Sequence, residues 1–155
     1  ITAMMNTVAD GGTYHTPRFV YGITNASQTL DEPVQISEDE PVLAADTARI
    51  LRDMLQSVVR DGIGREAAPQ EEEAGGKTGT AQTGQFDTSG EELLNYWFSG
   101  FYPADEPRYT ITVLQDGILE PEVSSAAIFG KIADSLQVLM TAETVQTPET
   151  AAKSS

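Results

Sequence analysis

The sequence predicts an α/β domain of the α+β type, in which an antiparallel sheet is flanked by helices. Three observations support this prediction. Apolar residues recur at helical spacing in three separate segments, three extended segments follow one another in the second half, and the short segment 104–107 joins the last two of these. With 155 residues, the chain is long enough for one domain with a core.

The first predicted helix lies at the very start of the chain. It is indicated by apolar residues at helical spacing, namely Ile1, Met4, Met5 and Val8. Gly11 and Gly12 then end it. Because no start methionine or capping residue precedes Ile1, we expect the chain to be cut from a longer one. Residues 17–23 are predicted to form a strand, and the polar segment 24–41 a loop with a short extended piece.

A second helix is predicted in the middle of the chain. Asp46 is a candidate N-cap, and Gly62 and Gly64 end the helix. Its apolar stripe consists of Ile50, Leu51, Met54, Leu55, Val58 and Val59. The acidic segment 66–73 that follows is predicted to be a solvated loop.

Three strands are then predicted, at about 74–83, 95–103 and 108–117. The many aromatic residues of the second suit a strand that is buried on both faces. In the third, Tyr109, Ile111 and Val113 should share one face, and Thr110 and Thr112 the other. Because the connection between these two strands is short and turn-like, we expect an antiparallel hairpin.

A last helix is predicted near the end of the domain. Ser124 or Ser125 can cap it, and its buried face is expected to consist of Ile128, Ile132, Leu136 and Leu139. Residues 1–140 are therefore assigned to the domain. Residues 141–155 lack apolar periodicity and are predicted to be a disordered tail.

The composition excludes several classes of function. A formal charge of −15 repels phosphate groups, so no nucleic acid is expected as a partner. The chain has no cysteine, which excludes disulfides, thiol catalysis and cysteine-bound zinc. The single histidine, His15, cannot build a multi-histidine metal site and is predicted to be a surface or loop residue. No metal or cofactor is implied.

The stretch EAGGKTGTAQTG, residues 73–84, contains the most informative motif. Gly-Lys-Thr ends a phosphate-binding loop, but that loop needs a glycine where this chain has Glu71 and a helix where glycines continue. On a strand, Lys77 and Gly79 share one face, and Thr78 and Thr80 the other. A cation, hydroxyls and backbone N–H groups then suit a ligand with a carboxylate and a carbonyl. Taken alone, Lys-Thr-Gly could also be an ordinary turn.

Further pieces of the sequence make the strand interpretation specific. They occur in the order ITAMMNTVADGGTYHTPRFV, VVRDGIGREA, AGGKTGTAQ, WFSGFYP, YTITVLQ and AAIFGKIAD. With these pieces, residues 1–140 resemble the transpeptidase domain of class B penicillin-binding proteins, the D,D-transpeptidases that cross-link peptidoglycan. The resemblance implies the penicillin-binding protein transpeptidase and serine β-lactamase-like fold. It also implies S-x-x-K, S-x-N and K-T-G motifs and acylation of a serine by stem peptides or β-lactams.

The same resemblance implies roles for four residues on the predicted strand. Lys77 would attract the terminal carboxylate of the donor peptide or of a β-lactam, and the Thr78 and Thr80 hydroxyls would bind that carboxylate. The backbone N–H of Thr80 would form half of the oxyanion hole, while Gly79 would keep the strand clear for the ligand. Gly75 and Gly76 are expected to ease packing before the site. Trp97 is expected to be a core aromatic residue on the neighbouring strand.

Two of the three motifs are missing from these residues. No serine has lysine three places on, and none has asparagine two places on. In the family both motifs precede the region at which Ile1 begins. The chain is therefore expected to hold the substrate-binding strand without nucleophile or base, and to be inactive alone. Because the family's sheet takes further strands from the missing part, the strand at 108–115 is expected to lack a partner, so that copies self-associate.

Two other classes of function stay open at this level. One is a non-catalytic binding module, and the other is a serine β-lactamase or β-lactam sensor, which shares a K-T-G strand. The GGTYHTPRFV stretch fits the transpeptidase better. For the parent protein, the resemblance implies an extracytoplasmic domain anchored by an N-terminal membrane helix and a glycan-polymerising partner.

Overall fold

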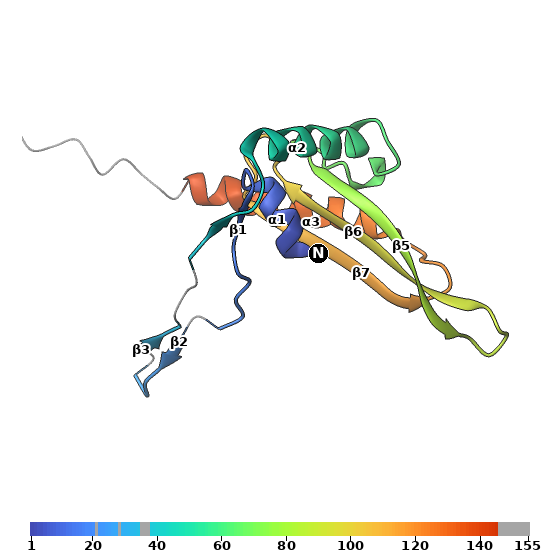
Figure 1. Cartoon of the computed structure of the whole chain (residues 1–155), viewed down its shortest axis with the longest axis horizontal. Helices are drawn as coiled ribbons and strands as arrows, with labels where there is room; N and C mark the ends of the chain where they lie inside the picture. The colour runs from blue at the N-terminus through green and yellow to red at the C-terminus, as the bar shows by residue number, and fades with distance from the viewer. Residues whose placement is uncertain (21, 28, 35–37, 146–155) are drawn as a thin grey trace, which may run out of the picture.

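The computed structural model describes residues 1–20, 22–27, 29–34 and 38–145. Helix α1 (Thr2–Ala9) leads into an arm with four short strands, which are β1 (Thr13–Tyr14), β2 (Gly22–Thr24), β3 (Leu30–Pro33) and β4 (Glu40–Pro41). Helix α2 (Ala45–Arg60) and the 3₁₀-helix η1 (Arg65–Ala67) follow. The chain continues with β5 (Gly75–Phe86), β6 (Glu92–Tyr102), β7 (Tyr109–Ile118) and α3 (Ser125–Val145). Figure 1 shows the sheet with helices around it and the arm projecting from the body.

The main sheet has the antiparallel order β5-β6-β7, as the sequence predicted. Gly79 lies opposite Trp97 in the register of β5 and β6, and Trp97 lies opposite Leu114 of β7. Directly paired residues point to the same face of an antiparallel sheet. The register therefore shows, for each residue of β5, which face of the sheet it lies on and which residues of β6 and β7 share that face.

One face of the sheet packs against α3. Tyr109, Ile111 and Val113 of β7 lie here, as predicted, beside the fully buried Phe98 of β6. Phe98 meets Phe129 of α3 with ring centroids 4.7 Å apart. The rest of this core comprises Val59, Ala67, Ala74, Tyr102, Ala126, Ala133 and Met140. This cluster is the larger of the two described cores.

The predicted buried face of the last helix is wrong at Ile132 and Leu139, whereas Ile128 and Leu136 are half-buried. Ser124 caps α3, as expected, because its Oγ accepts a hydrogen bond from the N–H of Ala127 at 3.0 Å. Ile132 is 37% exposed and Leu139 is 58% exposed, whereas Phe129 is fully buried. Apolar residues occur on several sides of α3, so periodicity did not select the face. The fit of the Phe129 ring against Phe98 and the small Ala133 selects it instead.

The other face of the sheet packs against α1, with α2 beside it. Met5 and Ala9 of α1 form a second core with Phe101, Ala104 and Leu55. Polar residues of α1 reach the predicted polar face of β7. Thr2 Oγ1 donates to Thr112 Oγ1 at 2.8 Å, and Thr110 Oγ1 donates to Asn6 Oδ1 at 3.1 Å. The predicted first helix is thus confirmed, and it forms a layer on this face of the sheet.

Several expectations for the first half of the chain need correction. The strand predicted at 17–23 is confined to Gly22–Thr24, and residues 17–20 are irregular. Asp46 is no N-cap; it lies in the first turn of α2, where a carboxylate interacts favourably with the helix dipole. Within the predicted α2 stripe, Ile50 and Met54 are largely exposed. The acidic segment 66–73 is mostly exposed but begins within η1.

Helix α3 runs to Val145, past the point at which the sequence predicted the tail to begin. The remainder of that predicted tail, residues 146–155, lies outside the described residues. None of the described helices combines the length and the apolar character that crossing a membrane requires.

Candidate functional site

Strand β5 carries all four of the predicted site residues. Register pairs join Lys77 to Ser99, Thr78 to Phe98, Gly79 to Trp97 and Thr80 to Tyr96, and the first shift in register comes only after Gln82. Lys77 and Gly79 therefore share the face that α1 covers further along the sheet, and Thr78 and Thr80 share the face of α3. Lys77, Gly79 and Thr80 are exposed, while Thr78 is half-buried. The structure brings the four residues together on one open strand.

In the part of the chain that the structure describes, β5 is an edge strand, because β6 pairs with it on one side and no strand pairs on the other. An edge strand presents backbone N–H and C=O groups to whatever lies beside it. The site is therefore an open strand with hydrogen-bonding capacity along one border.

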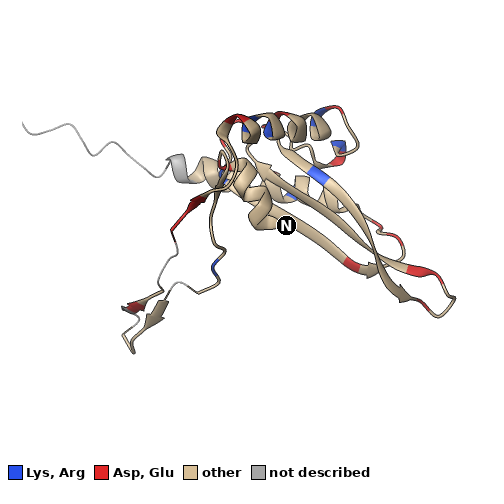
Figure 2. Cartoon of the chain, viewed as in Figure 1, with Lys and Arg blue, Asp and Glu red and all other residues tan. Residues whose placement is uncertain are grey.

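Lys77 is the only Lys or Arg within β5, and it forms the blue band on that strand in Figure 2. Its Nζ donates to the carbonyl oxygen of Thr78 at 2.8 Å and to Thr78 Oγ1 at 3.3 Å. Both acceptors are uncharged, so neither of these two hydrogen bonds is an ion pair. An anionic ligand could compete for the ammonium without first breaking an ion pair that the structure records.

Two glycines allow β5 to lie directly on aromatic rings just before Lys77. A Cβ atom on Gly75 would lie 2.3 Å from the ring of Phe101, and one on Gly76 would lie 2.6 Å from the ring of Phe98. Neither ring can move freely, because Phe98 and Phe101 are fully buried. The two rings belong to the two cores on opposite faces of the sheet, so the glycine pair lets β5 pack closely on both sides just before the site, as expected from the sequence.

Gly79 has a different environment. A Cβ atom there would meet only Trp97 Cβ, at the ordinary contact distance of 3.6 Å. The space beside the Cα atom of Gly79 is therefore open to solvent. The expected core position of Trp97 is wrong, because this residue is half-buried and belongs to neither buried cluster. Its register position places it on the same face as Lys77 and Gly79.

A network from α2 holds the chain that leads into β5. Arg52 donates through Nη2 to the carbonyl oxygens of Ala104 at 3.1 Å and Asp105 at 2.7 Å, and Gln56 Nε2 donates to Ala104 at 3.1 Å. The N–H of Ala104 in turn donates to the carbonyl of Glu73 at 2.8 Å, two residues before β5. Sequence reasoning missed Arg52 and Gln56, since their spacing on a polar helix face gives no sign of distant carbonyl acceptors.

One buried tyrosine lies behind the start of β5. The Tyr102 hydroxyl donates to Gln137 Oε1 at 2.8 Å, which ties β6 to α3. Burial, followed by the nearby carboxylate of Glu72, raises the pKa of Tyr102. The hydroxyl therefore remains protonated as the donor of this bond. Among the described residues, no group of three or more His, Asp or Glu side chains is arranged to hold a metal ion.

Comparisons with known proteins match this strand and its surroundings to one family. The family model described as "Penicillin binding protein transpeptidase domain" matches residues 1–134. Penicillin-binding protein PbpB of Mycolicibacterium smegmatis is 34% identical over 149 residues, covering 86% of this chain and 22% of that protein. Stage V sporulation protein D of Bacillus subtilis is 31% identical over 118 residues, covering 74% of this chain and 18% of that protein. The chain thus spans about a fifth of the length of these relatives.

Solved structures agree with the sequence comparisons. The crystal structure of penicillin-binding protein 3 from Mycobacterium tuberculosis in complex with ampicillin superposes with a TM-score of 0.72 at 29% identity, covering 97% of this chain and 36% of that one. The D,D-transpeptidase domain of a peptidoglycan glycosyltransferase from Eggerthella lenta gives a TM-score of 0.71 at 27% identity, covering 89% and 31%. The mixed fold, the family match and these likenesses agree, and the chain belongs to the transpeptidase domain family of the class B penicillin-binding proteins.

Proposed function

We propose that this chain is the part of a peptidoglycan D,D-transpeptidase that binds the terminal carboxylate of the donor stem peptide, or the equivalent carboxylate of a β-lactam. The observation that carries the proposal is the isolated cation of Lys77 on an exposed edge strand, two residues from the open Gly79. The relative in complex with ampicillin supports β-lactams as ligands. A bound carboxylate would take the place of the Thr78 oxygens as acceptor for Lys77.

The hydroxyls of Thr78 and Thr80 are the further donors to that carboxylate. Thr78 Oγ1 already lies 3.3 Å from the ammonium of Lys77, so a carboxylate drawn to the ammonium would come within reach of this hydroxyl. Thr80 is exposed and shares the parity of Thr78 along the strand. A charge-assisted hydrogen bond to a carboxylate is about twice as strong as one between neutral groups.

The backbone N–H of Thr80 is proposed to be one half of the oxyanion hole. The carbonyl of Thr78 is within reach of the Lys77 side chain, which favours its pointing to the open border of β5. In an antiparallel ladder, residues of the same parity send their backbone groups to the same side. The N–H of Thr80 would therefore also face the open border, where a ligand carbonyl could accept its hydrogen bond.

In the proposed reaction of the parent, a serine hydroxyl outside these residues attacks the carbonyl of the donor peptide. The amine of the terminal D-alanine leaves with a proton, and the acyl group then passes from the serine to an amine of a second peptide. No residue of this chain supplies the nucleophile, because no serine occurs in an S-x-x-K sequence. The parent is further proposed to act on the extracytoplasmic side of the membrane with a glycan-polymerising partner.

The first test incubates the 155-residue chain with a β-lactam and measures its intact mass. We expect no covalent adduct, since the chain has no nucleophile of the expected type. A stoichiometric adduct would contradict the assignment of the nucleophile to another part of the parent.

The second test measures acylation of the full-length parent by a fluorescent penicillin. Lys77→Ala should slow acylation by about 100-fold or more, as losses of single charge-stabilising groups do in active sites. The matched control is Lys131→Ala on the exposed side of α3, which should leave the rate unchanged. Equal rates for the two variants would refute a role of Lys77 in ligand binding.

A further inference from the structure

The arm of residues 13–43 is attached to the body at a narrow base. It leaves the body after α1 and returns to it just before α2. At its base, Thr13 pairs with Pro41 and Tyr14 with Glu40, and the N–H groups of Val42 and Leu43 both donate to the carbonyl of Gly12. Beyond this base the arm projects away from the main sheet, with β2 and β3 at its far end (Figure 1). Among the described residues, these contacts at the base help to set the orientation in which the arm leaves the body.

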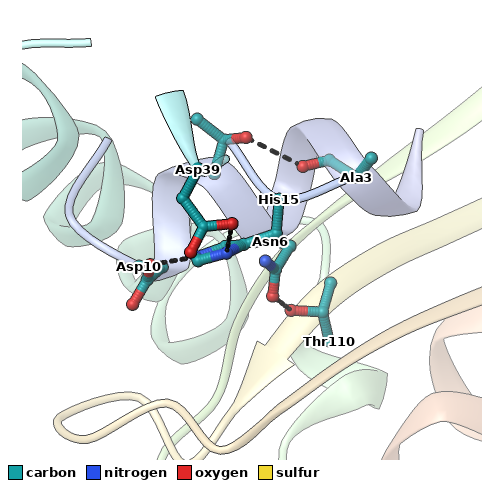
Figure 3. A network of polar contacts seen from close by, with 7 residues as sticks. Ala3, Asn6, Asp10, His15, Asp39 and Thr110 are labelled. Carbon is teal, nitrogen blue, oxygen red and sulfur yellow. Dashed lines mark hydrogen bonds and ion pairs between the residues drawn. The ribbon is translucent and has the colours of Figure 1, made fainter. Parts of the chain in front are cut away.

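His15 joins the three segments that meet at this base. Its Nε2 lies 2.5 Å from Asp10 Oδ2, and Asp10 is the residue that ends α1. Its Nδ1 lies 2.8 Å from Asp39 Oδ1, on the returning side of the arm. Figure 3 shows the imidazole ring between the two carboxylates. One side chain thus connects the end of α1, the outgoing segment and the returning segment.

The geometry requires a particular protonation state. A neutral imidazole carries one N–H, whereas an imidazolium carries two, and an ionised carboxylate can only accept. Both contacts of His15 can therefore be hydrogen bonds at the same time only when the ring is protonated. The hydrogen bonds to Asp10 and then to Asp39 raise the pKa of His15 above its ordinary value, against a smaller opposing effect of burial.

The surroundings of the ring contain other titratable groups. A cavity of about 160 Å³ beside His15 and Asp10 is lined by Arg108, just before β7, and by Tyr109 of β7, together with uncharged residues of α1, of β7 and of the turn before it. Glu40 of β4 is paired with Tyr14, next to His15 in the chain. The positive charge of Arg108 disfavours protonation of His15, whereas the negative charge of Glu40 favours it. The two aspartates are the groups within hydrogen-bonding distance of the ring.

We propose that His15 is a pH-sensitive clamp, which fixes the arm against the end of α1 when it is protonated and releases the arm when it loses its proton. Because protonation is favoured in the clamped state, the contribution of the clamp is present at low pH and is lost as the pH rises through the raised pKa of His15. Release would remove the bond to Asp39 or to Asp10, since the neutral ring can donate only once. The proposal is independent of the proposed function of Lys77.

The protonation part of the proposal can be tested by NMR, because the chain contains one histidine and so gives one imidazole signal. A titration from about pH 5.5 to about pH 9 should give a midpoint above the ordinary histidine value of about 6.5. Asp10→Asn and Asp39→Asn should each lower this midpoint. A midpoint at the ordinary value that neither variant changes would overturn the clamp.

The conformational part can be tested with spin labels, because the chain contains no cysteine. Labels on Ser27→Cys at the far end of the arm and Ser57→Cys on α2 should give a narrow distance distribution at low pH and a broad one at high pH. The change should occur at the NMR midpoint of His15. His15→Gln removes the charge but leaves the pairing of β1 with β4 at the base of the arm in place. In this variant the distance distribution should be broad at every pH. A distribution that is the same at all pH values in both proteins would overturn the proposal.

Discussion

Gly79 of β5 lies directly opposite Trp97 of β6, and the nearest side-chain atom that a Cβ on Gly79 would meet is Trp97 Cβ, at 3.6 Å. The distance is that of an ordinary contact, so the sheet itself does not require glycine at this position. The sequence nevertheless has glycine here, beside an exposed cation and on an open border of the sheet. Under the proposed function, the glycine at this position is therefore explained by ligand binding and not by packing within the sheet.

Gly79→Ala should leave stability almost unchanged but impair ligand binding. The added methyl group has room in the fold, and it would occupy the space into which a ligand on β5 must fit. In the full-length parent we expect acylation by a fluorescent penicillin to slow by about 100-fold, the typical effect of a small misplacement in an active site. Urea unfolding of the same variant checks that the fold is intact. Unchanged acylation would show that the ligand does not approach this residue.

Gly75→Ala and Gly76→Ala, unlike Gly79→Ala, should destabilise the fold. Here the methyl group would overlap the rings of Phe101 or Phe98, which are fully buried. Overpacking of this kind usually destabilises a protein by about 1 to 3 kcal/mol. The free energy of unfolding of each variant, measured in urea, should fall by that amount. If both variants were as stable as Gly79→Ala, the close fit of β5 on the two rings would be refuted.

The sequence was sufficient to predict the three strands of the main sheet, but not the short strands of the arm or all of the helix packing. Alternation of apolar and polar residues gave β7 and its two faces correctly, because a strand has only two faces. The side of α3 that is buried was missed, since apolar residues surround that helix and only tertiary fit distinguishes Phe129 from Ile132. Contacts between residues far apart in the chain, such as that of Arg52 with Asp105, carry no local signal.

The candidate site shows the same division. Lys77 and Gly79 could be placed on one face from spacing alone, and the register agrees. Trp97 was correctly expected on the neighbouring strand, but its half-buried place on the face of Lys77 and Gly79 was not predicted, because it depends on the register of two strands. The two bonds of His15 were likewise invisible in the sequence, since Asp39 is distant in the chain and approaches only when the arm folds back.

The buried face of α3 can be tested with two matched truncations on that helix. Phe129→Ala removes a fully buried ring that packs on Phe98, and it should lower the free energy of unfolding by about 3 to 5 kcal/mol. Ile132, by contrast, is 37% exposed, and Ile132→Ala should lower the free energy of unfolding by about 1 kcal/mol or less. Urea titrations followed by circular dichroism provide both values. A larger loss for Ile132→Ala would restore the face that the sequence first indicated.

The outer border of β7 is expected to mediate self-association of the chain. Among the described residues no strand pairs with β7 on the side away from β6, and Leu114 within it is 41% exposed. Such a border can pair with the same strand of a second copy, although the net charge of −15 opposes the approach of two chains.

Light scattering after size exclusion should therefore show a mass above that of the monomer, and the share of the larger species should grow with protein and salt concentration, because salt screens the repulsion. Leu114→Lys places a charge on the border without disturbing either described core, and it should shift the chain to the monomer. Leu139→Lys, on the exposed side of α3, adds the same charge away from the border and should change the association less. If both proteins with lysine dissociate equally, net charge and not strand pairing governs the assembly.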